Sequence, residues 1–303
     1  MINLFNIPDY TVDTSQFSNL LHDNIVQEFE ESFAEYVGAK YACMGNSASS
    51  LLFLALLNKN AKISIPSTIP AVVPNLIINS GNSISFYDDI DWVGNSYRLH
   101  ENIIDSAQEV SKNQYASLNE NDAIMIFSFY PTKPIGSCDG GMVVSNSKDS
   151  IDYFRTMTLN GMSFSTDNWK RIQTRAGFKM HSNSIQAFIA NENFKKIDEK
   201  NKRLSEVRAI YNKEFGYNNC SAHLYRIRVS DNKSFISNIK DNGIYCGIHY
   251  EPCHKVKCFG YKGKDLSLST KEGRQTVSIP FHEKLSDNDI DKVVNNVKKL
   301  ACF

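Results

Sequence analysis

The sequence lacks an excess of charge of either sign. Its 303 residues include 33 Lys and Arg and 33 Asp and Glu, so the formal net charge is zero. It also contains no basic block and no arginine-rich stretch. Proteins that bind nucleic acid or an anionic membrane usually carry such a basic footprint. We therefore expect no nucleic acid and no membrane among the partners of this chain.

Long apolar runs and leader-like features are also missing. No segment approaches the roughly 20 apolar residues that a helix needs to span a bilayer. The first residues, MINLFNIPDYTVDTS, have neither a basic start nor the apolar stretch of a secretory signal. These two absences together predict a cytoplasmic protein.

The cysteines show no pattern of a disulfide framework, because the seven of them are odd in number and scattered along the chain. Cys253, His254 and Cys258 lie close together, but they lack the paired spacing of a structural zinc site. We expect reduced thiols and no bound metal.

What the chain does have is an alternation of helical and strand patterns. Its 42% hydrophobic content is sufficient for a sizeable core. Apolar spacing predicts helices over 24–37, where Gly38 is the stop signal, 51–58 and 71–81. Apolar runs predict strands over 62–67, 83–89, 102–108, 123–130 and 140–146. Such alternation indicates an α/β fold with a largely parallel sheet covered on both faces.

The C-terminal third predicts a second, smaller domain. One long amphipathic helix is expected over 184–215, followed by a linker rich in glycine and asparagine. Beyond it come a strand candidate, a helix that stops at Gly243, and a last helix capped by Ser286 with Asp289 three residues later. We therefore predict a large domain over 1–215 and a small α/β domain over 216–303.

Lys133 stands in an unusual place for a lysine. It follows the apolar run AIMIFSFY and Pro131, which puts it at the carboxyl end of a buried strand. In open α/β sheets, ligands bind at that edge. A lysine withdrawn from water loses its proton more easily and becomes a nucleophile for carbonyl groups. The alternative is an ordinary surface lysine in a turn.

Two other stretches are expected at the same ligand-binding edge of the sheet. GNSASSLL (45–52) places small residues and serine hydroxyls at the start of a helix, which suits an anion but is equally common as a plain cap. Asp105 ends a short apolar strand and Gln108 follows three residues later, so a carboxylate and an amide can point into one crevice. The alternative for Asp105 is that it only caps the following turn.

The order of these parts along the chain indicates a cofactor. An anion cradle, then Asp105 and Gln108, then Ser128 and Lys133 supply partners for the phosphate, ring nitrogen, ring hydroxyl and aldehyde of pyridoxal 5′-phosphate. Each part alone is weak, but together they predict a site for this cofactor.

The sequence also resembles the DegT/DnrJ/EryC1/StrS sugar aminotransferases over most of its length. NSASSLLFLAL is similar to the family's phosphate-binding helix start, IIDSAQE to its Asp-x-x-Gln motif, and FSFYPTKPIGSCDGGMVV to its cofactor-lysine motif. Further matches include AGFKMHSNSIQAFIA, GIHYEPCHK and VSIPFHEKLSDNDIDKVV. The resemblance implies the fold of type I pyridoxal-phosphate enzymes, a three-layer sandwich with a small C-terminal domain.

The family's residue roles carry over to matching positions. By resemblance, Lys133 bonds to the cofactor aldehyde and later moves a proton, Asp105 pairs with the ring nitrogen, and Gln108 lies near the ring hydroxyl. The phosphate partners implied in the same way are Ser49, Ser50 and Ser128.

Other implied roles concern the partner subunit and the substrate. In the family, the segment matching FKMHSN reaches the cofactor phosphate of a neighbouring subunit. Relatives commonly have Asn or Arg where this chain has His181, and an imidazole can also donate to a phosphate. A homodimer with shared active sites follows. His249, Tyr250 and His254 are implied substrate contacts, because they match a family segment near the pocket.

The chain departs from the family in three places. Where relatives usually stack an aromatic ring on the cofactor, this sequence has Pro70. Relatives generally insert a strand and a helix before the Asp-x-x-Gln motif, whereas this chain offers only residues 92–101, so we expect a sheet element to be missing. The stretch 217–222 is also short, which predicts a trimmed small domain.

The function implied by the resemblance is transfer of an amino group, with glutamate as donor, to a nucleotide-linked keto-sugar. Two alternatives stay open. Some relatives remove a hydroxyl instead, but they lack the lysine that this chain retains as Lys133. The chain could also be a non-catalytic partner of a sugar-modifying enzyme, a hypothesis that the intact Lys133, Asp105 and Gln108 disfavour.

Overall fold

The computed structural model describes residues 1–8, 10–164 and 170–301. The chain forms two compact units. The five-stranded unit comprises Ile7–Asn58 and Ser96–Ile197, and the terminal unit comprises Met1–Asn6, Lys59–Asn95 and Asp198–Phe303. These units group the chain differently from the predicted domains, 1–215 and 216–303, and that division stays a prediction.

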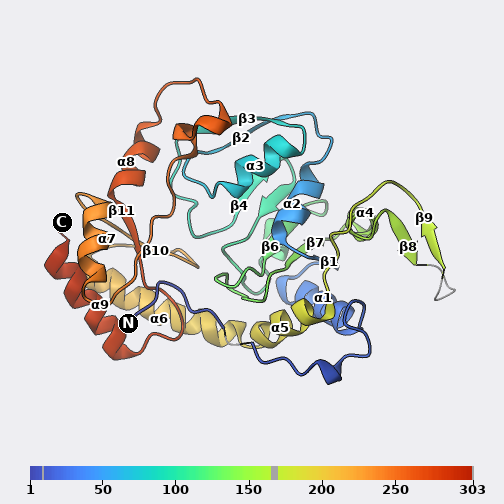
Figure 1. Cartoon of the computed structure of the whole chain (residues 1–303), viewed down its shortest axis with the longest axis horizontal. Coiled ribbons are helices and arrows are strands. Elements are labelled where there is room, and N and C mark those ends of the chain that lie inside the picture. The colour runs from blue at the N-terminus through green and yellow to red at the C-terminus, as the bar shows by residue number, and fades with distance from the viewer. Residues whose placement is uncertain (9, 165–169, 302–303) are drawn as a thin grey trace. The chain divides into compact units, whose positions relative to one another are not determined.

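The five-stranded unit contains the sheet that carries most of the predicted cofactor residues (Figure 1). The strands lie in the order β1-β7-β6-β5-β4. Their bounds are β1 Tyr41–Gly45, β4 Tyr97–His100, β5 Ile103–Asp105, β6 Ile124–Ser128 and β7 Gly141–Ser145. Its helices are α1 Ile25–Val37, α2 Ala48–Leu56, α4 Lys148–Thr158 and α5 Ser184–Phe194, with short 3₁₀ turns at Thr14–Gln16 and Ala116–Leu118. A small hairpin joins β8 Met162–Phe164 to β9 Arg171–Gln173.

The predicted α/β fold is confirmed, but the prediction of a largely parallel sheet is wrong. β5 pairs with β6 in parallel, whereas β1 with β7, β6 with β7 and β4 with β5 are antiparallel. Short connections explain the difference. His100 faces Ile103 across a two-residue turn, which can only join antiparallel strands. The chain between β6 and β7 likewise contains no helix that could carry it across for a parallel return.

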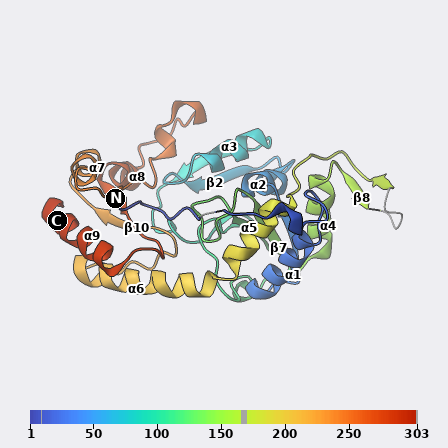
Figure 2. The same ribbon diagram turned by 60° about the horizontal axis from the view of Figure 1, so that its bottom comes forward.

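Helices cover both faces of this sheet (Figures 1 and 2). On one face, Phe29 and Phe33 of α1 and Ala187 of α5 share a buried cluster with Met125 and Phe127 of β6. Because side chains alternate along a strand, Ile126 and Ser128 point to the other face. That second face receives α2, since a Cβ added to Gly141 in β7 would lie 2.5 Å from the nitrogen of Ala48.

Strand direction brings several chain ends to one edge. β1, β5 and β6 run in the same direction, because each antiparallel step reverses it and the β5–β6 step does not. Gly45 and Ser128 are both register partners of Gly141, and Asp105 is opposite Ile126. The start of α2 and the loops after β5 and β6 therefore leave the same edge of the sheet.

The single helix predicted over 184–215 is two helices in the structure. α5 ends at Phe194 and α6 spans Ile197–Phe215. Two asparagines in the last turn of α5 disfavour helix continuation, and the Asn193 side chain donates to the Gly136 carbonyl. The expected apolar stripe is also interrupted between Ile189 and Ile197.

The terminal unit has its own core and two small strand pairs. β2 Lys62–Pro66 and β3 Ser83–Tyr87 are parallel, and β10 Tyr225–Arg228 and β11 Thr276–Ile279 are antiparallel. Its helices are α3 Val72–Asn79, α6, α7 Asn232–Lys240, α8 Ser267–Gln275 and α9 Asp287–Leu300, with 3₁₀ turns at Cys253–Lys255 and Lys257–Phe259. The predicted capping box of the last helix is confirmed, because Ser286 and Asp289 each accept the other's backbone N–H. Within the part of the chain that the structure describes, no helix combines the length and apolarity needed to cross a bilayer.

Candidate active site

Asp105 is the buried carboxylate of the site. It ends β5 and is 5% exposed. Its Oδ1 accepts the Ala107 N–H at 2.9 Å and its Oδ2 accepts the Tyr97 hydroxyl at 2.9 Å. Burial raises the pKa of Asp105, while these two donors and the charge of Lys133 act in the opposite direction. Asp105 therefore caps the turn that follows it, which was the structural alternative predicted from the sequence. The charge of Lys133 also acts on this carboxylate.

Gln108 lies in the loop directly after Asp105 and is buried as well. Its Oε1 makes no hydrogen bond with any residue that the structure describes. A buried amide oxygen without a donor costs free energy, about 1–3 kcal/mol. Such an orphaned acceptor is expected where a ligand supplies the missing donor.

Lys133 follows β6 in a tight turn, in which its N–H donates to the Tyr130 carbonyl at 2.8 Å. The residue is partly buried. Burial lowers the pKa of its amine, and the Asp105 carboxylate opposes that shift. The amine is therefore partly withdrawn from water and feels the charge of Asp105, while the catalytic role of Lys133 stays a prediction.

The predicted phosphate cradle is the first turn of α2. Ser47 caps this helix by accepting the Ser50 N–H at 3.1 Å, and its hydroxyl lies 3.0 Å from that of Ser50. The first turn of any helix leaves backbone N–H groups without helical acceptors and has a partial positive charge. Ser49 is partly exposed beside them. Residues 47–50 therefore offer donors for an anion.

Ser128 ends β6 at the same edge and is 8% exposed. Its hydroxyl accepts the Tyr130 N–H at 3.3 Å, which leaves its proton for another acceptor. Because Ser128 and Gly45 both pair with Gly141, this hydroxyl lies one strand away from the segment that enters α2.

His181 lies next to the chain that enters α2. It forms an isolated bridge with Gly45, and the Asn46 N–H donates to the neighbouring Met180 carbonyl at 2.8 Å. Its Nδ1 is 2.8 Å from the Ser182 carbonyl, and its ring centroid is 4.9 Å from that of His22. The role predicted for His181 involves a second subunit and stays a prediction.

The three predicted substrate contacts belong to the terminal unit. His249 Nδ1 lies 2.9 Å from the Ser278 hydroxyl, and the Tyr250 ring stacks on Trp92 with 6.3 Å between centroids. Pro70, the predicted substitute for a stacking ring, belongs to this unit too. Their predicted roles are not tested by these contacts.

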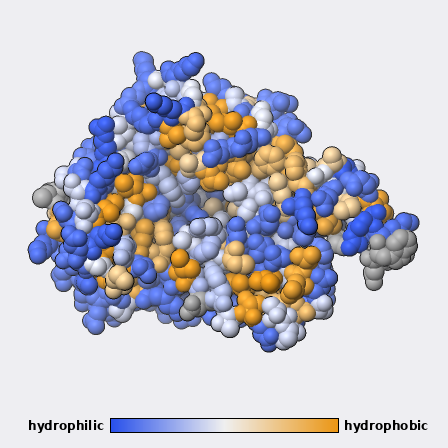
Figure 3. Space-filling view, in the orientation of Figure 1, coloured by the Kyte–Doolittle hydropathy of each residue, from blue (hydrophilic) through white to orange (hydrophobic). Residues whose placement is uncertain are grey.

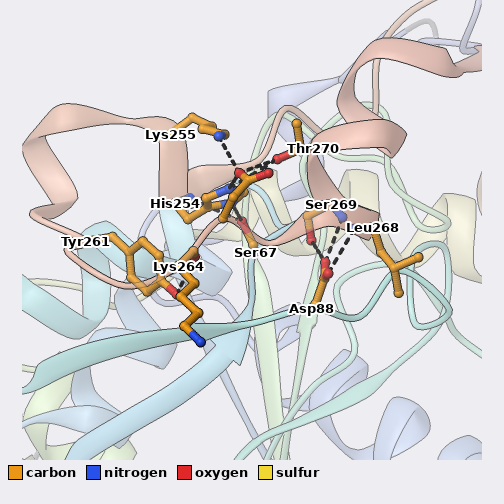
Figure 4. A network of polar contacts seen from close by, with 10 residues as sticks. Ser67, Asp88, His254, Lys255, Tyr261, Lys264, Leu268, Ser269 and Thr270 are labelled. Atoms are coloured by element: carbon orange, nitrogen blue, oxygen red, sulfur yellow. Dashed lines mark hydrogen bonds and ion pairs between the residues drawn. The ribbon is translucent and has the colours of Figure 1, made fainter.

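His254 is part of a closed polar network (Figure 4). Its Nδ1 is 2.6 Å from the Ser67 hydroxyl and its Nε2 is 3.2 Å from Asp265, which also accepts from Thr270 and Lys255. Ser67 is fully buried and also accepts the His254 N–H. A substrate contact by His254 would have to break one of these bonds. No group of three or more His, Cys, Asp or Glu among the described residues is placed to hold a metal.

Sequence reasoning missed Tyr97, the residue that donates to Asp105. It belongs to the stretch 92–101, in which we expected a sheet element to be missing. The stretch forms β4, whose first residue is the register partner of Asp105, and the expectation about a missing element stays a prediction. A hairpin count across the turn at 101–102 would have put Arg98 opposite Asp105, so the sequence offered no signal for Tyr97.

Comparison with known proteins identifies the family. The sequence profile of the DegT/DnrJ/EryC1/StrS aminotransferase family matches residues 9–91 and 103–298. The chain is 26% identical to the spore coat polysaccharide biosynthesis protein SpsC of Bacillus subtilis, over 91% of this chain and 89% of that protein. It is 24% identical to a UDP-4-amino-4,6-dideoxy-N-acetyl-beta-L-altrosamine transaminase of Campylobacter jejuni, over 91% and 92%. These alignments span 348 and 345 positions, more than the 303 residues here, so the relatives contain segments without counterpart in this chain.

Solved structures show the same fold. The aminotransferase TlmJ from Streptoalloteichus hindustanus superposes with a TM-score of 0.82 at 18% identity, covering 99% of this chain and 98% of that one. Helicobacter pylori PseC, an aminotransferase involved in the biosynthesis of pseudoaminic acid, superposes with a TM-score of 0.79 at 18% identity, covering 98% and 99%. With the profile match over most of the chain, the resemblance predicted from the sequence is confirmed, and the chain belongs to the DegT/DnrJ/EryC1/StrS aminotransferase family.

Proposed function

We propose that this chain is a pyridoxal-phosphate aminotransferase that transfers an amino group, with glutamate as donor, to a nucleotide-linked keto-sugar. Membership of an aminotransferase family supports the reaction type. The name of the Campylobacter jejuni relative, which is a transaminase of a UDP-linked sugar, supports the substrate class. The observation that carries the proposal is that the buried Asp105 and the partly buried Lys133, whose charges influence each other, follow neighbouring parallel strands to the sheet edge from which α2 starts.

The residues at this edge fit the cofactor. The Gln108 Oε1 needs a donor, and a ring hydroxyl is one. Each Asp105 oxygen accepts one protein hydrogen bond and has a second lone pair for a protonated ring nitrogen. The first turn of α2 and the Ser128 hydroxyl offer donors for a phosphate.

Pyridoxal 5′-phosphate, when bound, supplies an aldehyde that exchanges amines and a ring that withdraws electrons from the substrate carbon. Asp105 would hold the ring nitrogen in its protonated state. Ser49, Ser50 and Ser128 would fix the phosphate, and Gln108 the ring hydroxyl. These contacts come from three separate chain segments, so they would orient the ring without relying on a single loop.

Lys133 would carry the proton in the reaction. Its lowered pKa increases the neutral fraction of the amine, which is the form that attacks a carbonyl or accepts a proton. The same amine, once protonated, returns the proton to a neighbouring carbon. A buried position favours this exchange because water does not compete for the proton. His249 and Tyr250 are proposed to contact the sugar nucleotide, whereas the predicted contact by His254 would require one of its two ring hydrogen bonds to open.

Replacement of Lys133 tests the proposal directly. Borohydride treatment of the protein with pyridoxal 5′-phosphate should attach the cofactor to the peptide that contains Lys133, as read by mass spectrometry. Lys133→Ala should abolish this attachment and reduce transamination by about 10²–10⁴-fold. Lys148→Ala is the control, since Lys148 is exposed and paired with Asp152.

Other results would favour the alternatives. Wild-type protein that retains no cofactor would indicate a non-catalytic partner. A deoxygenated sugar product, in place of an aminated one, would indicate a dehydratase.

We further propose a homodimer in which His181 contributes to the cofactor phosphate of the partner. Exposed apolar side chains support an interface on the five-stranded unit, because Leu20 and Leu21 are 47% and 51% exposed. Figure 3 shows hydrophobic surface in this orientation over the region where Figure 1 draws α1 and α5. Leu21 and His181 line one cavity of about 190 Å³.

Subunit mixing tests the shared site. His181→Ala and Lys133→Ala should each be defective alone. In a mixed dimer, one site would combine an intact Lys133 with an intact His181, so activity should partly return. Mixed dimers as inactive as the Lys133→Ala homodimer would contradict a shared site, and a monomer in light scattering would contradict the dimer.

A further inference from the structure

The Asp105 carboxylate is held by a residue of β4, a strand that the sequence did not predict. Its Oδ2 accepts a hydrogen bond from the Tyr97 hydroxyl at 2.9 Å, whereas its other oxygen is bound by the loop that follows it. Tyr97 opens β4, the edge strand of the sheet. The family profile ends at residue 91 and resumes at 103, so it covers neither β4 nor Tyr97.

The register of β4 explains how the phenol reaches the carboxylate. Tyr97 and Asp105 are direct partners in an antiparallel pair, so their side chains project from the same face of the sheet. A bulge between Arg98 and His100 produces this pairing, because an uninterrupted hairpin would put Arg98 opposite Asp105. Leu99, the extra residue, is buried.

β4 is anchored on both sides of the hairpin. The Ser96 N–H and hydroxyl both donate to Glu109 Oε2 at 3.0 Å, and Glu109 follows Gln108 directly. On the far side, Arg98 pairs with Glu120 at 2.6 Å. The strand is therefore tied to the loop that carries Asp105 and Gln108.

From these contacts we infer that Tyr97 is a positioning residue, which fixes the Asp105 carboxylate toward the cofactor ring nitrogen in place of the longer segment that relatives contain. The inference rests on the proposed function. With Ala107 on one oxygen and Tyr97 on the other, the carboxylate cannot rotate without losing a hydrogen bond. The same hydroxyl favours the charged form of Asp105, which is the form that a ring nitrogen needs.

Tyr97→Phe removes the hydroxyl and keeps the ring. Tyr153→Phe is the matched control, because the Tyr153 hydroxyl donates to the Leu54 carbonyl at 3.2 Å and contacts no residue of the site. We expect Tyr97→Phe to weaken the affinity for pyridoxal 5′-phosphate about tenfold, as for loss of a hydrogen bond to a charged group, and Tyr153→Phe to leave it unchanged. Fluorescence titration of the apoprotein gives both dissociation constants.

Two more measurements separate positioning from general packing. Loss of the hydroxyl should move the acid limb of cofactor binding to higher pH, because Asp105 then holds its proton more strongly. In an Asp105→Asn background, Tyr97→Phe should have no additional effect on affinity. This cycle remains valid even if the single variant lowers the melting temperature.

The outcomes are distinct. Wild-type protein that does not bind the cofactor would overturn the proposed function and this inference together. Wild-type binding with equal affinity in Tyr97→Phe would overturn only the role of Tyr97. A tenfold loss that persists in the Asp105→Asn background would also overturn it, since the phenol would then not act through the carboxylate.

Discussion

Two polar clusters in this protein contain similar groups, but one has an acceptor without a donor and the other has a partner for each group. At the sheet edge of the five-stranded unit, burial shifts the pKa values of Asp105 and of the partly buried Lys133, and Gln108 Oε1 has no donor among the described residues. In the terminal unit, both ring nitrogens of His254 and the hydroxyl of Ser67 have partners.

The difference separates a site for a ligand from a structural network. Protein interiors rarely leave polar atoms unpaired, so an orphaned acceptor beside a lysine of lowered pKa indicates a missing partner. A network in which each group is satisfied stabilises the fold and has little capacity for a new ligand. A serine, a histidine and an aspartate in contact do not by themselves make an active site.

Among changes that distinguish the two clusters, Asp105→Asn should have the largest effect. The variant loses the charge that would hold the ring nitrogen protonated, so kcat/KM for transamination should fall by about 10–100-fold, as for loss of a hydrogen bond to a charged group. The melting temperature of the apoprotein should stay the same or rise, because burial disfavours the charged carboxyl. A large loss of stability would show that Asp105 is mainly structural.

His254→Ala should instead lower stability and leave transamination largely unchanged. It leaves the buried Ser67 without its imidazole partner, which should reduce the free energy of unfolding by about 1–3 kcal/mol. Lys255→Ala is the control: it removes an exposed donor to the same Asp265 and should cost at most about 1 kcal/mol. Denaturant unfolding measures both. Lost transamination at unchanged stability would instead support the predicted substrate contact.

Much of the fold was predictable because apolar periodicity is a local signal. α1, with its stop at Gly38, and β6 and β7 fall where the pattern placed them. Strand direction was not predictable in the same way, because it depends on the length of the connections and on whether they contain a helix. The break between α5 and α6 was missed because the helical pattern resumes at Ile197, although the apolar stripe is interrupted before it.

The site was predictable to the extent that its residues follow strand ends. Asp105 and Ser128 come to one edge because β5 and β6 are parallel, and Lys133 follows β6. Tyr97 could not be assigned from the sequence. Its pairing depends on a bulge that adds one residue to β4, and a one-residue shift decides which side chain faces Asp105.

Gln108→Leu should have two smaller effects of opposite sign, one on the stability of the apoprotein and one on cofactor affinity. Removing a buried amide whose oxygen has no donor among the described residues should raise the free energy of unfolding of the apoprotein by about 1 kcal/mol. The same change should weaken pyridoxal 5′-phosphate binding by several-fold, because the proposed partner of the ring hydroxyl is lost. Thermal melts with and without cofactor measure both quantities. A variant that is less stable without cofactor would show that Gln108 already has a structural partner.

The smallest effect expected is a shift in the pH at which Lys133 reacts. Burial lowers its pKa, so the folded chain releases this proton before the unfolded chain does as pH rises, and stability increases through that window. An amine-reactive label, read by mass spectrometry, should therefore modify Lys133 at lower pH than Lys148, whose pKa is raised by its hydrogen bond to Asp152. Because the Asp105 charge raises the pKa of Lys133, Asp105→Asn should move labelling to still lower pH. Movement to higher pH would mean that the two side chains do not interact as the structure indicates.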